Sequence, residues 1–314
     1  MLVVVGLAAV VFCAVLLVLL ATRGPGAARF PVYGWVGLAA LALFEALLFA
    51  HVAWVATFFT ALVWTAYIVA ADAAVFRLRG DSLLHHGRAF TAMAGLSVVA
   101  WLIFEAYNVH LLNWDYAGVP QSFPIFAVGA VWAFATVFPG IFETADLFHS
   151  TWAVGTRCRP RQFRAAPLWM ALGALCLLLP LALPARWAAY LFALVWAGFI
   201  LLLDPWLYRR GLPSLEGDLE RGEPGRLWAL LAAGAACGFF WEFWNFWAAA
   251  RWVYIFPILH RYRIFAMPFP GFLGFPPFAL ECFLLYILLA HWLLPPAWRI
   301  PLSWLRGTRN QDPA

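Results

Sequence analysis

Long apolar runs, each about the length of a membrane-spanning helix, follow one another along almost the whole chain. An α-helix needs about 20 apolar residues to cross a hydrocarbon core of ~30 Å. This pattern occurs nine times, at residues 2–21, 32–50, 54–76, 89–112, 130–152, 167–185, 187–207, 228–250 and 271–294. The break between the second and third runs is inferred from length alone. The pattern predicts an all-α polytopic membrane protein with about nine transmembrane helices.

The polar segments between these runs are short and rich in arginine. All 20 basic residues are arginines, in a chain that is 65% apolar and 11% charged with a mean hydropathy of +0.84. With the N-terminus outside, sixteen arginines fall in the inner segments 23–31, 77–88, 153–166, 208–227 and the C-terminal tail, and four fall in the outer segments. Cytoplasmic loops carry such an excess of arginine. We therefore expect an integral protein of the cytoplasmic membrane with a cytoplasmic C-terminus, and no nucleic-acid partner.

The first apolar run is expected to remain as an anchor. It has no basic region before it and no small-residue cleavage pattern, and Arg23 and Arg29 follow it directly. Residues 1–30 are therefore predicted to form an N-terminal transmembrane helix and its loop.

The rest of the chain contains an internal duplication. The first copy has Ala61-Leu62-Val63-Trp64, Asp72, Glu105, Asn108, Trp114, Tyr116, Pro139 and Glu143; the second has Ala193-Leu194-Val195-Trp196, Asp204, Glu242, Asn245, Trp252, Tyr254, Pro277 and Glu281. Trp to Asp is 8 residues in both copies, Glu to Asn is 3, and Tyr to the last Glu is 27. The offset encloses four spans, an even number, so both copies should enter the membrane in the same direction. The predicted architecture is one leading helix and two parallel four-helix repeats, at 31–160 and 161–296, followed by a cytoplasmic tail at 297–314.

Four of the duplicated residues are glutamates inside apolar spans. An acid at membrane depth costs ~2.5–3.5 kcal/mol on insertion scales, so such residues usually face the interior of a helix bundle and have a function. The candidate catalytic residues are Glu105, Glu143, Glu242 and Glu281.

Each of two candidate glutamates has an asparagine three residues later on the same helical face. Asn108 follows Glu105, and Asn245 follows Glu242. One interpretation is a hydrogen-bonded clamp between helices, a common use of polar residues in membranes. The other is a buried, protonated carboxyl that acts as an acid while the Asn carboxamide orients it. Both interpretations remain open at this point.

The duplicated aspartates and prolines are weaker candidates. Asp72 and Asp204 lie five residues before inner arginines, so each is either an interfacial ion pair or a supporting residue of the site. Pro139 and Pro277 each precede a glutamate by four residues. A proline frees a carbonyl and kinks a helix, which predicts a cavity beside each glutamate.

Aromatic residues surround one of these acids. The chain has 19 Trp, 29 Phe and 9 Tyr, and the segment 239–247 encloses Glu242 with them. Belts at the membrane interface explain many of these rings, whereas rings around a mid-helix acid can stabilise a desolvated cation by ~2 kcal/mol. The predicted substrate-binding residues are Trp114, Tyr116, Trp241, Trp252 and Tyr254.

The sequence predicts no cofactor and no metal. The five cysteines form no CxxC pair, and no glycine-rich phosphate loop or Asp-rich diphosphate motif is present. The histidines His51, His110, His149, His260 and His291 show no HxxxH or ExxH spacing. A metal held by Glu and His side chains from different helices remains an alternative.

Together these motifs resemble the tandem-repeat lycopene cyclases, integral membrane carotenoid cyclases with two small helical units. The family has an acid on one helix, then a Trp-x-Tyr loop, then a helix that begins with proline and carries an acid. In the second copy these parts resemble Glu242, Trp252-Val253-Tyr254 and Pro277 to Glu281. In the first copy they resemble Glu105, Trp114-Asp115-Tyr116 and Pro139 to Glu143. A single glutamate stands where the family has a Glu-Glu pair, and the Tyr-to-Pro segment is longer.

The resemblance implies acid-initiated ring closure of an acyclic isoprenoid end group, without cofactor or redox change. A glutamate would protonate a terminal double bond, aromatic rings would shelter the cation, and a second carboxyl would remove a proton. The partner is then a hydrophobic small molecule dissolved in membrane lipid. Two alternatives stay open: a transporter or ion pathway that uses midplane carboxylates, and a non-catalytic lipid-binding or structural membrane protein.

Overall fold

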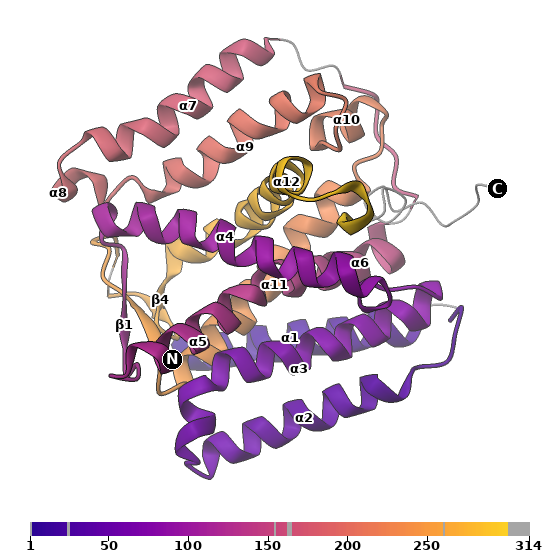
Figure 1. Cartoon of the computed structure of the whole chain (residues 1–314), viewed down its shortest axis with the longest axis vertical. Coiled ribbons are helices and arrows are strands. Elements are labelled where there is room, and N and C mark those ends of the chain that lie inside the picture. The colour runs from indigo at the N-terminus through magenta and orange to yellow at the C-terminus, as the bar shows by residue number, and fades with distance from the viewer. Residues whose placement is uncertain (1, 24–25, 154, 162–164, 260, 301–314) are drawn as a thin grey trace.

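The computed structural model describes residues 2–23, 26–153, 155–161, 165–259 and 261–300 (Figure 1). The longer helices are α1 (Leu2–Arg23), α2 (Val32–Phe49), α3 (Ala53–Arg79), α4 (Gly87–Leu111), α5 (Phe123–Ala135), α6 (Val137–Phe148), α7 (Ala166–Ala182), α9 (Phe192–Arg209), α11 (Gly225–Trp247) and α12 (Phe275–Leu293). Short helices are η1 (Leu83–His86), η2 (His149–Ala153), α8 (Ala185–Ala188), α10 (Leu215–Glu220), η3 (Phe269–Gly274) and η4 (Pro296–Trp298). The protein is therefore mostly helical, as predicted.

Eight helical segments of the described chain are long and apolar enough to cross a membrane. They correspond to eight of the nine predicted spans, and α5, α6 and η2 together form one of them. The remaining predicted span, 167–185, contains α7, which is apolar but has only 17 residues. The break inferred between the second and third spans is present, because α2 ends at Phe49 and α3 begins at Ala53. These helices support an integral membrane protein.

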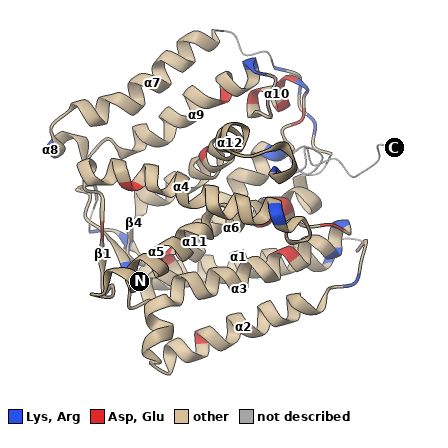
Figure 2. Ribbon diagram, in the orientation of Figure 1, with Lys and Arg blue, Asp and Glu red and all other residues tan. Residues whose placement is uncertain are grey.

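Most long helices run across the view of Figure 1, with small strands at one end. Strands β1 (Trp114–Ala117) and β2 (Arg251–Tyr254) pair with each other, as do β3 (Arg263–Ile264) and β4 (Met267–Pro268). We call this end of the bundle the ribbon end. Most of the arginines lie at the opposite end, near η1 and α10, which we call the arginine-rich end (Figure 2). The predicted polar loop around residues 209–226 lies here and contains α10, whose N-cap Ser214 accepts a hydrogen bond from Gly217.

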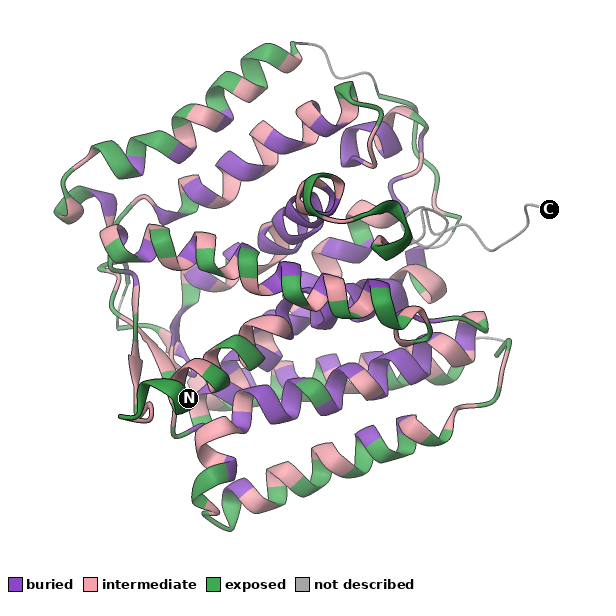
Figure 3. Cartoon of the chain, viewed as in Figure 1, coloured by how far each residue is buried: buried purple, intermediate pink, exposed green. Residues whose placement is uncertain are grey.

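The core lies between the central helices, and the outer helices expose apolar side chains (Figure 3). Every residue of α6 from Val137 to Phe148 is buried. Helix α11 packs against α6 and α12, while α2 packs on α3 and α7 packs on α9. The outer apolar faces of α1, α2 and α7 are those expected to meet lipid, because water would not tolerate so much exposed hydrocarbon.

Local chemistry explains where the key helices end. Helix α3 stops at Gly80, which adopts φ +79° and donates its N–H to Phe76 O, a conformation that glycine takes without strain. Helices α5 and α6 are separated at Thr136, and Ser97 of α4 bridges the break. Its hydroxyl donates to Phe134 O at 2.6 Å and accepts from Phe138 N at 3.0 Å.

The predicted kink residues both lie in the first turn of a helix. Pro139 is the third residue of α6, directly after the break, and Pro277 is the third residue of α12. A proline is tolerated in a first turn because the N–H that it lacks has no intrahelical acceptor there. The predicted tail begins at 297, and its residues from 301 onward lie outside the described part of the chain.

Candidate functional site

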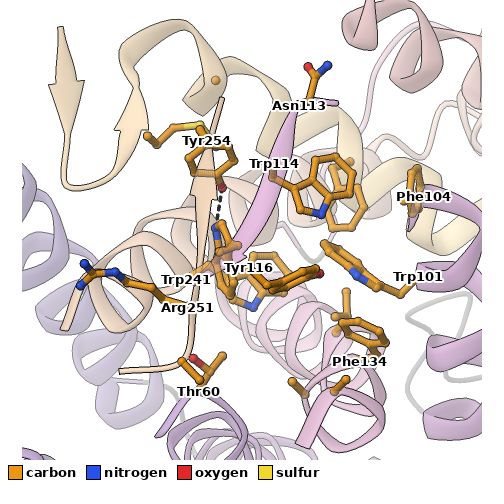
Figure 4. A pocket seen from close by; sticks show the side chains of 18 of the residues that line it. Thr60, Trp101, Phe104, Asn113, Trp114, Tyr116, Phe134, Trp241, Arg251 and Tyr254 are labelled. Carbon is orange, nitrogen blue, oxygen red and sulfur yellow. Dashed lines mark hydrogen bonds between the residues drawn. The ribbon is translucent and has the colours of Figure 1, made fainter. Parts of the chain in front are cut away.

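A cavity of about 310 Å³ lies between the helices toward the ribbon end. Its walls come from α3, α4, α5, α9, α11, α12 and both strands β1 and β2. All five of the predicted substrate-binding residues line it, together with Trp101, Phe104, Phe134, Trp196 and Phe278. Figure 4 shows several of these rings turned toward one another around the cavity. The volume is that of a small-molecule site.

The lining is almost entirely apolar. Among the described residues that line the cavity, Arg251 is the one charged side chain, and Figure 4 shows it directed away from the rings. Its guanidinium donates to Phe246 O at 3.3 Å. The buried hydroxyl of Thr60 also lines the cavity and has no hydrogen-bond partner among the described residues. A hydrocarbon ligand suits such walls better than a charged one.

The two Trp-x-Tyr segments meet at the ribbon end as antiparallel strands. Trp114 pairs with Tyr254, and Tyr116 pairs with Trp252. The Trp of each copy thus faces the Tyr of the other copy across one ladder. The paired residues are 140 and 136 positions apart in the sequence, and all four line the cavity.

Each predicted asparagine clasps the backbone of the tryptophan that begins its own segment. Asn108 Nδ2 donates to Trp114 O at 2.8 Å, and Asn108 Oδ1 accepts from Trp114 N at 3.1 Å. Asn245 makes the same two bonds to Trp252, at 2.9 and 3.0 Å. The asparagines therefore position the strands and leave the acids free for other contacts.

The first of the two predicted glutamates in each copy accepts a hydrogen bond from the tyrosine of that copy. Tyr254 donates to Glu242 Oε1 at 2.6 Å, and Tyr116 donates to Glu105 Oε1. Two causes raise the pKa of Tyr254 well above its ordinary value: its burial, which has the larger effect, and the neighbouring Glu242. Burial and Glu105 likewise raise the pKa of Tyr116. Both phenols therefore keep their protons at neutral pH. Each phenol group lies between a carboxyl and the cavity.

The two Tyr–Glu pairs differ in how many donors reach the acid. Glu105 Oε1 accepts from Tyr116 and also from the indole N–H groups of Trp101, at 2.8 Å, and Trp114, at 3.2 Å. Glu242 has Tyr254 as its donor, and its Oε2 is buried with no partner among the described residues. Three donors suit a carboxylate, whereas a buried oxygen without a donor suits a neutral acid.

The other two candidate glutamates lie away from the cavity. Glu143 and Glu281 are fully buried, and neither belongs to the cavity lining. No hydrogen bond reaches their carboxyl oxygens from the described residues. The structure thus places Glu105 and Glu242 next to the cavity tyrosines and separates Glu143 and Glu281 from them.

The duplicated aspartates hold the loops at the arginine-rich end. Asp72 accepts from Leu84 N at 2.8 Å and from the hydroxyls of Tyr33 and Ser82. Asp204 accepts from Leu215 N and Glu216 N at 2.6 and 2.9 Å, at the start of α10. Both aspartates therefore fasten the segment that follows their helix by its backbone N–H groups.

Several participants were not among the predicted site residues. Trp101 and Phe134 line the cavity, and Glu45 of α2 accepts a hydrogen bond of 2.8 Å from Trp244 of α11. Trp101 lies four residues before Glu105, one turn away on the same helical face, and that spacing is a signal that could have identified it. The contact between Glu45 and Trp244 joins residues 199 positions apart, which no local pattern reveals.

Within the described residues, no three His, Cys, Asp or Glu side chains are grouped so that they could hold a metal ion. His260, one of the histidines considered above, lies outside those residues. Comparison with known proteins finds no matching family model, no matching curated protein and no matching solved structure.

Proposed function

We propose that the protein is a membrane isomerase or cyclase that acts on the end group of an acyclic, carotenoid-like isoprenoid. The observation that carries this proposal is an aromatic cavity bordered by two matched Tyr–Glu pairs. The resemblance of the same residues to tandem-repeat lycopene cyclases supports it. The substrate would reach the site from the membrane in which it dissolves.

The chemistry of the walls supports an apolar, cation-forming substrate. Aromatic faces attract a cationic centre by ~2 kcal/mol or more once it is desolvated. Trp101, Trp114 and Trp241 supply three such faces around the cavity. A reactive carbocation would also be kept from water, since almost no polar group lines the site.

The inequality of the two pairs supports a division into acid and base. In the proposed reaction the hydrogen bond between the two groups first reverses, so that neutral Glu242 donates to the Tyr254 oxygen. Tyr254 then gives its phenol proton to a terminal double bond and takes the proton of Glu242. A carbocation and the Glu242 carboxylate form together. A second double bond of the substrate then donates its electron pair to the cation, which closes a ring and moves the positive charge.

The second pair completes the proposed reaction. Tyr116 takes a proton from the carbon beside the cation and passes its own proton to the Glu105 carboxylate. The C–H electron pair becomes the new ring double bond. One proton has then moved from Glu242 to Glu105, the product has the mass of the substrate, and return of that proton resets the site. Positioned proton donors and acceptors of this kind contribute about 10²- to 10⁴-fold each to a rate.

The proposal includes an arrangement for the chain in the membrane. Helices α2, α3, α4 and α5–α6 form one repeat, and α7, α9, α11 and α12 form the second, parallel repeat, after the leading helix α1. The equivalent asparagine clasps and the pairing of β1 with β2 support this division. The ribbon end then faces outward, and the arginine-rich end faces the cytoplasm.

A second candidate is a non-catalytic lipid-binding protein. One observation favours it: Asn108, Asn245, Asp72 and Asp204 are each bonded to backbone groups and hold loops or strands. In that case the Tyr–Glu pairs would serve the same structural purpose, and the cavity would hold a lipid unchanged.

The deciding experiment expresses the chain in a bacterial host that accumulates lycopene and related acyclic isoprenoids. We expect a new compound of unchanged mass and shifted retention in the lipid extract. Glu242→Gln keeps the size of the side chain and removes its transferable proton, so it should abolish the product. Glu45→Gln is the matched control. Glu45 is also an intramembrane acid that accepts one hydrogen bond, from an indole N–H, but Glu45 does not line the cavity. An unchanged extract from well-folded protein would favour the lipid-binding candidate.

A further inference from the structure

A second cluster of acids lies inside the bundle toward the arginine-rich end, and the cavity chemistry does not use it. Its centre is Glu143 on α6, whose side chain is 0% exposed. Both carboxyl oxygens lack a hydrogen-bond partner among the described residues. Helix α3 packs against α6 here: Tyr67 bonds Thr144 at 2.7 Å and Arg79 pairs with Asp146, so Asp72, between Tyr67 and Arg79 on α3, lies beside Glu143.

The neighbouring charges leave Glu143 without a cation of its own. Asp146 forms an ion pair with Arg79, so these two charges compensate each other. Asp72 receives three donors, from Tyr33, Ser82 and Leu84 N, which satisfy it as a carboxylate. The charged and titratable groups around Glu143 come from three helices: Asp72, Arg79 and Tyr67 of α3, Asp146 of α6 and Tyr33 of α2. Two thiols lie farther away, beyond Tyr67: Cys237 of α11 and Cys13 of α1.

An ionised Glu143 in this position would be costly. It would be a buried anion with no donor, next to a second anion, and two like charges at short range cannot both ionise without a large penalty. A proton on Glu143 removes that penalty and gives the pair a hydrogen bond, from the acid to the Asp72 carboxylate. The arrangement is that of a carboxyl pair that shares one proton.

The pair also has a hydrogen-bonded connection to the surface. Ser82 is buried and donates to Asp72 Oδ2 at 2.9 Å. The Ser82 hydroxyl lies 2.8 Å from His85 Nδ1, and His85 is exposed. Three hydrogen-bonding groups, His85, Ser82 and Asp72, therefore lie in line between solvent and Glu143.

We propose that Glu143 and Asp72 form a buried proton-binding site that exchanges with water at the arginine-rich end through Ser82 and His85. The site takes one proton and no metal. On its inner side a further row of polar groups continues, from Thr144 next to Glu143 to the Tyr67 hydroxyl at 2.7 Å. The row ends beneath Trp64, whose ring packs against Trp241 of the cavity wall at 4.9 Å. This site does not depend on the function proposed for the cavity.

The second copy of the sequence provides a matched control. Glu281, the counterpart of Glu143, is equally buried and has no hydrogen-bond partner among the described residues. Among the described residues Glu281 forms no ion pair, and no hydrogen-bonded row links it to the surface. It should hold its proton without fast exchange.

Infrared spectroscopy of the purified full chain in lipid nanodiscs tests the proposal. The C=O stretch of protonated carboxyls is recorded at neutral pH, before and after transfer to D₂O, for the native chain, Glu143→Gln and Glu281→Gln. We expect each variant to lose one protonated band, and the Glu143 band to shift in D₂O much sooner than the Glu281 band. Loss of no band in folded Glu143→Gln, or exchange no faster than that of Glu281, would overturn the proposal.

A second variant keeps the test decisive if Glu143→Gln does not fold. Ser82→Ala leaves both carboxyls in place and removes one step of the relay. It should slow deuterium exchange of the Glu143 band about tenfold, the effect of losing one hydrogen-bonded step, and leave the Glu281 band unchanged. Equal exchange rates in Ser82→Ala and the native chain would contradict a route through Ser82. Neither readout uses activity, so failure here is distinct from failure of the proposed reaction.

Discussion

Tyr254 donates its phenol hydrogen to Glu242 across 2.6 Å, from a strand at the cavity to a helix in the core. Glu242 itself does not line the cavity, whereas Tyr254 does. The acid can therefore act on a ligand only through the tyrosine. This relationship makes the hydroxyl of Tyr254, rather than the carboxyl alone, the group whose removal tests the chemistry.

If the proposed reaction holds, Tyr254→Phe should lower product formation about 10²-fold or more, because the phenol is the proton donor in that reaction. The ring and its packing remain, so the protein should still fold and elute as a single species in detergent. Product is measured in lipid extracts of the lycopene-accumulating host. Tyr208→Phe is the control, since Tyr208 bonds Glu220 at the arginine-rich end and should leave the yield unchanged. Equal yields from the two variants would contradict a role for Tyr254.

Glu105→Gln should change the products rather than stop the reaction at its start. Glu105 accepts three donors and is assigned the final proton removal, so the variant still forms the cation. We expect less of the native product, with water-addition products or double-bond isomers in its place, resolved by chromatography and mass spectrometry. A clean loss of all products, identical to that of Glu242→Gln, would show that the two acids do not have separate roles.

Asn245→Ala should destabilise the protein. Asn245 is fully buried and satisfies both the N–H and the C=O of Trp252, and loss of a buried partner costs about 1–3 kcal/mol. The thermal unfolding midpoint in detergent should fall, and Asn108→Ala should lower it to a similar degree. Gln121→Ala, at an exposed position, is the comparison. An unchanged midpoint in both variants would remove the clasp as a stabilising feature.

The membrane helices could be predicted from the sequence because each apolar run is long enough to cross the hydrocarbon core. The duplication marks Glu105 with Tyr116, 11 residues apart, and Glu242 with Tyr254, 12 residues apart, but it does not predict that each phenol bonds its acid. It also marks Trp114, Tyr116, Trp252 and Tyr254, which line the cavity, whereas Trp101 and Phe134 carry no such mark. The fold class and the membrane location therefore needed only local information.

Other features depend on contacts that no local pattern carries. The strands β1 and β2 have four residues each, and a strand that short resembles a loop until its partner is known. The directions of Glu143 and Glu281 were not predictable, since their helices are apolar on all sides and no face is marked as the interior. The neighbours of Asp72 come from α2 and from η1, and their approach depends on how the loop after α3 folds back.

Gly234→Ala should destabilise the contact between α11 and α12. A Cβ at Gly234 would lie 2.3 Å from Phe275 O, a backbone atom that cannot move aside cheaply. Overpacking of this kind typically costs about 1–3 kcal/mol. Gly95→Ala on α4 is the matched control, because a Cβ there meets nothing within 4 Å. Thermal unfolding in detergent should separate the two variants, and a midpoint for Gly234→Ala at or above that of Gly95→Ala would contradict the close packing.

Cys158 can report the orientation of the chain in the membrane. It is exposed, at the arginine-rich end, whereas Cys13, Cys237 and Cys282 are buried and Cys176 is partly buried. If that end is cytoplasmic, a membrane-impermeant maleimide should label Cys158 in inverted vesicles and leave it unlabelled in intact spheroplasts. Gln121→Cys in a Cys158→Ser background places the thiol at an exposed position near the ribbon end and should give the reverse pattern. Labelling of Cys158 from outside would invert the proposed topology, and with it the side from which protons reach Glu143.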